Sequence, residues 1–171
     1  MGLYIRVAAK EDAGLIADIS RQTFYETFVG FNTPANMDKF MREQFSRELL
    51  MSEVGQPGNT FLLAYDSVEL AGYARLRENN NPPGLAGMNT LEIARIYASK
   101  EHIGKGVGKA LLLQCLEIAR EKKISTIWLG VWEHNLRAIS FYMQWGFEKF
   151  GTHVFMLGDD AQTDWLMKKV I

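Results

Sequence analysis

Residues 91–119 read LEIARIYASKEHIGKGVGKALLLQCLEIA, and they join a strand, a glycine-rich turn and a long helix. Residues 91–98 are predicted as a strand, and a helix with one apolar face begins near residue 107. The turn between them contains Gly104, Gly106 and Gly108. Alternating glycines let a backbone approach a ligand without Cβ obstruction. Because a helix start also leaves N–H groups unpaired and carries partial positive charge, the turn predicts an anion site, most naturally for phosphate.

The spacing of the three glycines distinguishes between known types of phosphate-binding loop. A single glycine before a helix is usually only a tight turn, but here Lys105 and Lys109 add positive charge to three glycines. A phosphate loop of the Walker A type requires glycine at position 103 and serine or threonine at position 110, but this chain has Ile103 and Ala110 there. Because the hydroxyl that would bind magnesium is missing, nucleotide hydrolysis is disfavoured. The dinucleotide fingerprint needs a third glycine at residue 109, where Lys109 stands. The spacing that remains is Gly-x-Gly-x-Gly after a strand.

The elements on either side indicate a mixed α/β fold. Alternating apolar residues predict six further strands, at residues 3–7, 60–65, 70–77, 126–132, 147–157 and 164–170. Three further helices are expected: one capped by Asp12, one starting at Thr33-Pro34 and ending before residue 55, and one over residues 136–145. Loops are expected at residues 79–87 and 158–163. This order predicts an antiparallel meander followed by crossover connections.

Composition narrows the class of protein. The chain has 171 residues, 47% of them hydrophobic and 23% charged, as expected for one globular domain over residues 1–171. Apolar runs are short and no signal peptide is evident, so we expect no membrane association. The single cysteine, Cys115, fits a reducing cytoplasm and lies on an apolar helix face. A net charge of −1 disfavours nucleic-acid binding. His102, His134 and His153 lack metal-ligand spacing, so no metal is expected.

A second motif lies in the helix over residues 136–145. It reads Asn135-x-x-Ala138-x-x-Phe141-Tyr142-x-x-x-Gly146-Phe147. Asn135 suits the N-cap and Gly146 the residue after the helix end. For an isolated tyrosine such as Tyr142 a packing role is the ordinary interpretation. Here the motif follows the glycine turn after one helix and one strand.

The two motifs together resemble those of the GCN5-related N-acetyltransferases, over nearly the whole chain. The pyrophosphate loop of that family reads Gln/Arg-x-x-Gly-x-Gly/Ala, and Gly106 and Gly108 match its small positions. Ile103 stands in place of the usual Gln or Arg, which removes a polar side chain but leaves the backbone amides. The resemblance implies a central mixed sheet of about seven strands, splayed in the middle and flanked by about four helices.

The resemblance also implies acetyl-CoA as co-substrate. Its pantetheine arm is expected to pair with the strand end, near residue 96, where the sheet splays, and Asn135 to reach into the gap. Tyr142 is expected beside the CoA sulfur as the general acid, because a phenol is protonated at neutral pH. The residues implied in acetyl-CoA binding are Ile96, Tyr97, Ala98, Ile103, Gly104, Lys105, Gly106, Val107, Gly108, Lys109, Asn135 and Tyr142.

Glu92 is the candidate general base, since a Glu early in this strand is a base in some relatives; an ordered water is the alternative. With regular alternation, Glu92, Ala94, Ile96 and Ala98 share one face. The ordinary interpretation of Glu92 is a solvent-facing residue or a partner for Arg95.

The acceptor is expected to be the primary amine of a small molecule. Residues 151–164 resemble the branch that contains the bacterial polyamine acetyltransferases of the PaiA type, which implies spermidine or spermine. Five acids are expected near strand ends or loops that border the acceptor groove, where a polycation needs carboxylates: Glu78, Glu92, Glu133, Asp159 and Asp160. Two alternatives remain open: a protein or peptide N-acetyltransferase, and a non-catalytic acyl-CoA-binding regulator. A monomer or a homodimer is expected.

Overall fold

The computed structural model describes residues 2–171, which form seven strands and five α-helices. The strands are β1 (Leu3–Val7), β2 (Asn59–Asp66), β3 (Glu69–Glu78), β4 (Thr90–Ala98), β5 (Thr126–Trp132), β6 (Glu148–Leu157) and β7 (Asp160–Val170). The helices are α1 (Ala13–Phe28), α2 (Pro34–Glu43), α3 (Arg47–Glu53), α4 (Val107–Glu121) and α5 (Leu136–Gln144). None of the helices in these residues is long and apolar enough to cross a membrane.

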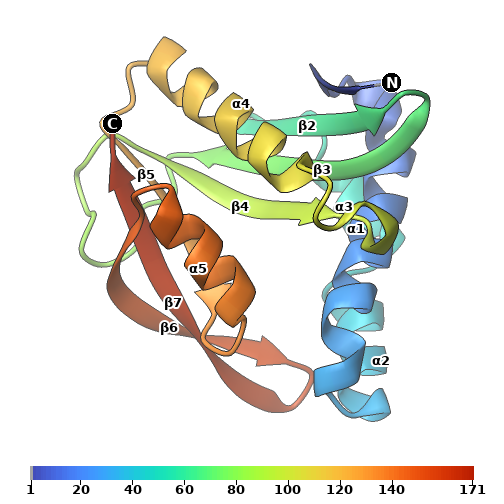
Figure 1. The fold of residues 1–171 in the computed structure, drawn as a ribbon. Helices are drawn as coiled ribbons and strands as arrows, with labels where there is room; N and C mark the ends of the chain where they lie inside the picture. Colours follow the sequence, from blue (N-terminus) through green and yellow to red (C-terminus); the bar gives the residue numbers. More distant parts are fainter. Residues whose placement is uncertain (1) are drawn as a thin grey trace.

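All seven strands belong to one mixed sheet, in the order β1-β2-β3-β4-β5-β7-β6 (Figure 1). Only β4 and β5 are parallel; every other neighbouring pair is antiparallel. The meander β1–β4 and the crossover through α4 confirm the predicted fold class.

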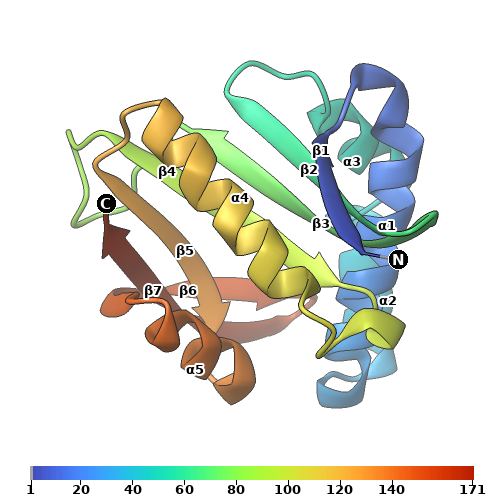
Figure 2. The same ribbon diagram turned by 45° about the horizontal axis from the view of Figure 1, so that its top comes forward.

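Helices cover both faces of the sheet. Leu62 and Ala64 on β2 pack against α4, whereas Phe61 and Leu63, one residue out of phase, belong to the core under α1. This period of two places α4 and α5 on one face and α1 to α3 on the other (Figure 2). The core is therefore divided by the sheet.

The helical region after Thr33 differs from the prediction. Thr33 caps α2 as expected, because its hydroxyl accepts a hydrogen bond from the Asn36 N–H. The helix ends at Glu43, however, and a separate helix α3 begins after Ser46, whose hydroxyl accepts from the Leu49 N–H at 3.3 Å. The sequence prediction merged two helices because their apolar residues continue across the break.

The prediction of a loop over residues 158–163 is wrong. Leu157 pairs with Asp160, so the connection is a two-residue hairpin turn of Gly158 and Asp159. Gly158 has a φ of +62°, and a Cβ there would lie 2.8 Å from the Asn36 carbonyl oxygen. The turn is tight because it packs directly on the first turn of α2.

Candidate active site

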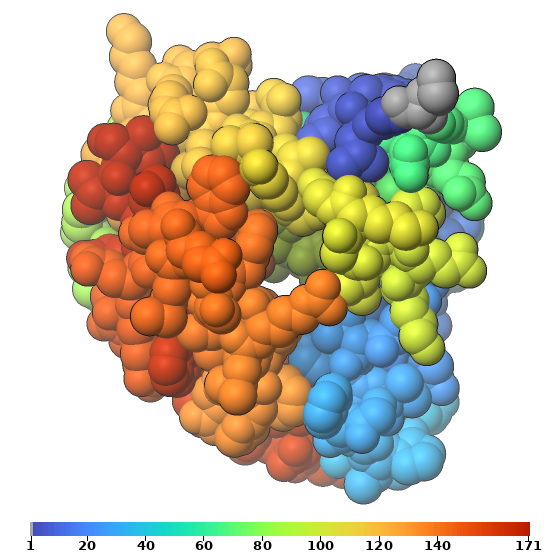
Figure 3. All heavy atoms as spheres, in the orientation of Figure 1, coloured from blue at the N-terminus to red at the C-terminus, as the bar shows by residue number. Residues whose placement is uncertain are grey.

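The site lies where β4 and β5 separate. Their pairing runs from Thr90 opposite Thr126 to Ile93 opposite Leu129 and stops there. A cleft of about 420 Å³ opens between the two strand ends. Figure 3 shows a narrow opening between the segment around α5, in orange, the turn before α4, in yellow, and the N-terminal helices, in blue. The expected splay is therefore present.

A β-bulge in β4 corrects the predicted faces. Arg95 pairs with Arg75, but Ile93 pairs with Leu76, so Ala94 has no partner of its own on β3. The alternation breaks at this residue. The expectation that Glu92, Ala94, Ile96 and Ala98 share one face is wrong, because an inserted residue reverses every side chain that follows.

Ile93 before the bulge and Ile96 and Ala98 after it pack with the core under α4. Arg95 and Tyr97 face the α1 side together with Glu92. Each of residues 92 to 97 borders the cleft. The cleft therefore connects both faces of the sheet: one side carries the backbone of the strand end, and the other carries charged side chains.

The glycine turn lies between the end of β4 and the start of α4, and its residues are not part of the cleft lining. Gly104 and Gly106 have φ values of +81° and +86°, a region that favours glycine. α4 begins at Val107, so the N–H groups of its first turn have no partner within the helix. Lys105 and Lys109 are exposed beside them. This geometry suits an anion.

Arg137 is a cation that the sequence reasoning missed. A Cβ on Gly104 would lie 3.8 Å from a guanidinium nitrogen of Arg137 on α5. Arg137 is exposed, and within residues 2–171 it has no ion-pair partner. No local signal marked it, since only the packing of α5 beside α4 brings it to the turn.

Tyr142 borders the cleft from α5. The helix starts as predicted, because the Asn135 side chain accepts a hydrogen bond from the Ala138 N–H at 3.2 Å. Tyr142 is 7% exposed and packs edge-on against Phe147. Burial, and then the nearby Cys115, raises the pKa of the Tyr142 phenol. Its hydroxyl has no hydrogen-bond partner in the part of the chain that the structure describes, and it is held protonated.

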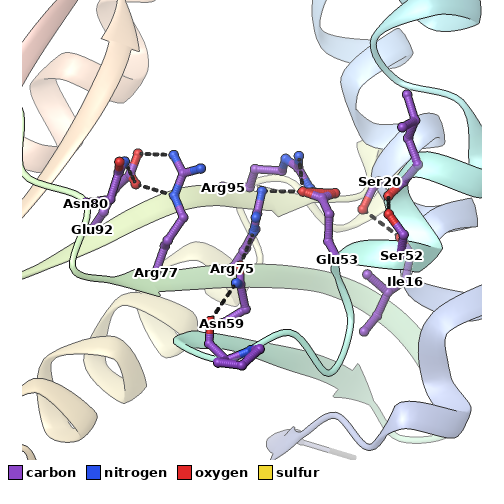
Figure 4. Close-up of polar contacts among 12 residues, drawn as sticks. Ile16, Ser20, Ser52, Glu53, Asn59, Arg75, Arg77, Asn80, Glu92 and Arg95 are labelled. Atoms are coloured by element: carbon purple, nitrogen blue, oxygen red, sulfur yellow. Dashed lines mark hydrogen bonds and ion pairs between the residues drawn. The ribbon is translucent and has the colours of Figure 1, made fainter.

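Glu92 is not a free carboxylate (Figure 4). It accepts hydrogen bonds from Arg77 at 2.7 and 3.1 Å and from the Asn80 amide at 2.7 Å. Its partner is Arg77, not the Arg95 weighed from the sequence. Both carboxylate oxygens are engaged while the side chain borders the cleft, and any proton that Glu92 accepts must compete with these three donors.

Arg95 belongs to a separate charged cluster beside Glu92. The Glu53 carboxylate on α3 accepts from both terminal nitrogens of Arg95, at 3.0 and 2.9 Å, and pairs with Arg75 (Figure 4). Burial, and then the charge of Arg95, lowers the pKa of Arg75 to about 10. These ion pairs connect α3 to β3 and β4. They fix the positions of Arg75 and Arg95, which border the cleft.

Two groups on β6 and β7 complete the polar lining. His153 stands opposite Asp164 in the strand register, with its Nε2 3.1 Å from an Asp164 carboxylate oxygen. This hydrogen bond raises the pKa of His153, against the opposing effect of burial. Sequence reasoning placed His153 on a strand but missed that the hairpin brings it into the cleft.

Four of the five predicted acids lie elsewhere. Asp159 pairs with Lys39 at 2.6 Å and Glu78 with Lys122 at 3.4 Å, and neither borders the cleft. Glu133 and Asp160 also lie outside its lining. Of the five predicted acids only Glu92 borders the cleft, and the cleft lining contains a second acid, Asp164, that was not predicted. The rest of the α1-side wall is aromatic, and the sequence did not indicate it: Phe24, Phe28, Phe40, Phe45, Trp132 and Phe155.

The remaining candidates for site chemistry are clusters of metal-ligating side chains and the single cysteine. Within residues 2–171 no group of three or more His, Cys, Asp or Glu side chains is arranged to hold a metal ion. Cys115 is fully buried in α4, and burial raises the pKa of its thiol to about 12. A protonated, inaccessible thiol does not act as a nucleophile.

Comparison with known proteins gives consistent results. The sequence of residues 21–147 matches the sequence model of the acetyltransferase (GNAT) family. An uncharacterised N-acetyltransferase encoded in the pepI 3′ region of Lactobacillus delbrueckii subsp. lactis is 41% identical over 167 residues, which is 98% of this chain and 96% of that relative.

Two further matches come from Thermoplasma acidophilum. A spermidine N(1)-acetyltransferase is 27% identical over 173 residues, covering 99% of this chain and 98% of that relative. The crystal structure of a PaiA N-acetyltransferase in complex with coenzyme A superposes with a TM-score of 0.80 at 26% identity, over the full length of both chains.

Proposed function

The chain belongs to the acetyltransferase (GNAT) family and is an N-acetyltransferase, and we propose that it transfers the acetyl group of acetyl-CoA to a primary amine of a small polyamine. The observation that carries this proposal is the cleft between β4 and β5. Tyr142, a protonated phenol, borders this cleft, and the glycine-rich turn that follows the end of β4 leads into the start of α4.

We propose that acetyl-CoA lies along the free edge of β4. The backbone of Ile96, Tyr97 and Ala98 has no β5 partner, so it is available to pair with the pantetheine amides. The pyrophosphate would accept hydrogen bonds from the turn before α4 and its first turn. The residues of that site are Ile103, Gly104, Lys105, Gly106, Val107, Gly108 and Lys109, with Asn135 bordering the cleft across the gap.

Transfer is proposed to be direct, in a complex of the enzyme with both substrates. The amine nitrogen attacks the thioester carbon, the carbon–sulfur bond breaks, and the electron pair goes to sulfur. The Tyr142 hydroxyl donates a hydrogen bond to the departing sulfur and so stabilises the charge that develops there. An acyl-enzyme on the only cysteine, Cys115, is disfavoured by its burial.

For the base, Glu92 and an ordered water were both expected from the sequence. The three hydrogen bonds that Glu92 accepts favour the route through water, with the carboxylate supplying negative charge beside the ammonium group before it loses its proton. This role for Glu92 is part of the proposal.

The polyamine assignment rests on two supports. One is the likeness to the spermidine N(1)-acetyltransferase, at 27% identity over nearly the whole chain. The other is the lining of the cleft, where the Asp164 and Glu92 carboxylates stand near an aromatic wall. Ammonium groups bind both to carboxylates and to aromatic faces, and the methylene segments between them pack on apolar surface. A cytoplasmic location, as a monomer or homodimer, is proposed with it.

Acetyl-CoA binding is tested by thermal unfolding. At one hundred times its Kd, acetyl-CoA should add about 2.7 kcal/mol and raise the Tm by roughly 5–10 °C. Gly106→Glu should abolish the rise, because it sets a negative charge at the pyrophosphate site. Gly30→Glu should retain it, since a Cβ at Gly30 meets no atom within 4 Å and Gly30 is not part of the proposed pyrophosphate site. Wild-type protein that shows no thermal or calorimetric response would refute the proposal.

The acceptor is tested by thiol release from acetyl-CoA over a panel of spermidine, spermine, amino acids and short peptides. Polyamines are expected to give the highest kcat/KM, and their turnover should weaken with rising salt because exposed charges are screened. If peptides or amino acids clearly outperform polyamines, the polyamine assignment fails and the acetyl-transfer assignment stands.

A further inference from the structure

Acetyl transfer to an amine releases a proton, and the residue that accepts it has yet to be assigned. This inference rests on the proposed function. The acceptor nitrogen starts as an ammonium group, loses one proton before attack and a second as its bond to carbon forms. Glu92 already accepts three hydrogen bonds, from Arg77 and Asn80, which compete with any further proton. A neutral imidazole has an unshared pair available near neutral pH.

His153 is the imidazole that the fold brings to this point. Of the three histidines, only His153 borders the cleft that Tyr142 also borders. A Cβ built on Gly130 would lie 3.5 Å from the His153 ring, so the ring stands over the backbone of β5. Gly130 is the first residue of β5 beyond the last β4 partner, Leu129. The imidazole therefore lies where the two strands separate.

Asp164 determines how His153 is held. The 3.1 Å hydrogen bond joins its carboxylate to Nε2, so the Nε2–H is the donor and Nδ1 carries the unshared pair. The Asp164 side chain is 16% exposed and the His153 side chain 44% exposed. A partly buried carboxylate behind a half-exposed imidazole fixes the tautomer and stabilises the imidazolium, while solvent can remove the proton afterwards.

We propose that His153, oriented by Asp164, is the general base that takes the proton from the attacking amine, directly or through one water. The nitrogen–carbon bond forms as the proton moves to Nδ1, the carbon–sulfur bond breaks, and sulfur is protonated by way of the Tyr142 hydroxyl. His153 then returns its proton to solvent, and Tyr142 is reprotonated from solvent. The first proton of the ammonium group leaves to solvent before attack. In the transfer step the nitrogen loses one proton and the sulfur gains one, so the overall reaction releases one proton to solvent.

The charges around His153 set the pH at which it works. Asp164 on β7 raises its pKa, and Glu92 on β4 acts in the same direction. Arg77 on β3, the partner of Glu92, borders the same cleft and opposes it. Because only the neutral imidazole accepts a proton, activity should fall as the pH drops through the pKa of His153.

The test is a pH–rate profile under single-turnover conditions, so that the chemical step is observed. His153→Gln should lower the rate roughly 10²–10⁴-fold and remove the acidic limb of the profile. The KM for acetyl-CoA and the Tm should stay near wild type, because the side chain is half exposed. Asp164→Asn should lower the rate and shift that limb to lower pH. Imidazole added to His153→Ala should restore part of the rate.

The matched control is His134→Gln. His134 is exposed, lies outside the cleft lining and pairs with Glu133. It should keep both the rate and the acidic limb. If His153→Gln retains the wild-type rate and limb while acetyl-CoA still binds, the role of His153 is refuted and the proposed function survives. If the wild type binds no acetyl-CoA and acetylates no amine, the proposed function itself fails.

Discussion

Gly72 offers a sharp test of how the fold supports acetyl-CoA binding. It lies on β3 opposite Ala98, beside the start of α4. A Cβ at Gly72 would stand 2.5 Å from the Tyr97 carbonyl oxygen, 2.7 Å from Val107 Cγ1 and 3.2 Å from Ala98 Cα. Two of these atoms belong to backbone held in the β3–β4 ladder, so they cannot swing aside. Gly72→Ala must therefore displace the end of β4 or the first turn of α4.

The expected cost follows from overpacking. Forcing one methyl group into a packed position costs about 1–3 kcal/mol. For a domain of this size each kcal/mol lowers the Tm by roughly 2–4 °C, so a decrease of roughly 2–12 °C is expected. Because the displaced atoms border the proposed pantetheine and pyrophosphate sites, kcat/KM for acetyl-CoA should fall on the order of ten- to a hundred-fold.

The assays are thermal unfolding and acetyl-CoA titration at 25 °C, well below either melting temperature, so that lost affinity is separate from lost folding. Gly30→Ala is the matched control, because its Cβ meets no atom within 4 Å. It should change the free energy of unfolding by less than about 0.5 kcal/mol. A Gly72→Ala protein that melts and binds like wild type would refute the reasoning from close approach.

Three further predictions concern single side chains. Tyr142→Phe should lower kcat roughly 10- to 1000-fold with little change in the KM for acetyl-CoA, and an unchanged single-turnover rate would remove the phenol from the mechanism. Arg137→Gln should raise the KM for acetyl-CoA several-fold, and the increase should be larger at low salt than at high salt. The control Arg120→Gln, at the other end of α4, should leave this KM unchanged. If both variants raise the KM equally, the placement of Arg137 beside the glycine turn is contradicted. The hydrogen bond from Arg6 lowers the pKa of Asp12 to about 2, so this carboxylate stabilises the fold above its unfolded pKa of about 3.9 and the stabilisation is lost as the pH falls towards 2. Asp12→Asn should therefore cost about 1 kcal/mol at pH 7 by chemical denaturation, and a difference that persists undiminished at pH 2 would contradict the ion pair.

The elements that were predicted well are those with a local cause. Thr33 caps α2 through its own hydroxyl, and Asn135 caps α5 in the same way. The positive φ at Gly104 and Gly106 is a property of glycine itself. Each depends on residues within one turn of the chain, so the pattern alone carries the information.

The errors arose where distant segments meet. Nothing in residues 91–98 marks Ala94 as an inserted residue, because a bulge is defined by pairing with β3. The separate helix α3 is held by Glu53, which pairs with Arg75 and Arg95 far along the chain. The length of the turn at Gly158 depends on its packing against Asn36.

The sequence by itself determined the fold class, the glycine turn before α4 and the resemblance to the family that made Tyr142 a candidate, because these depend on periodicity, glycine spacing and two short motifs. Only the tertiary structure decided which carboxylates border the cleft and that Glu92 forms an ion pair with Arg77. It also decided that His153 is hydrogen-bonded to Asp164 and that its ring packs on Gly130. The reason is physical: the charge that a group holds and the partner that it meets depend on neighbours across the sheet, which strand register and one β-bulge bring into place.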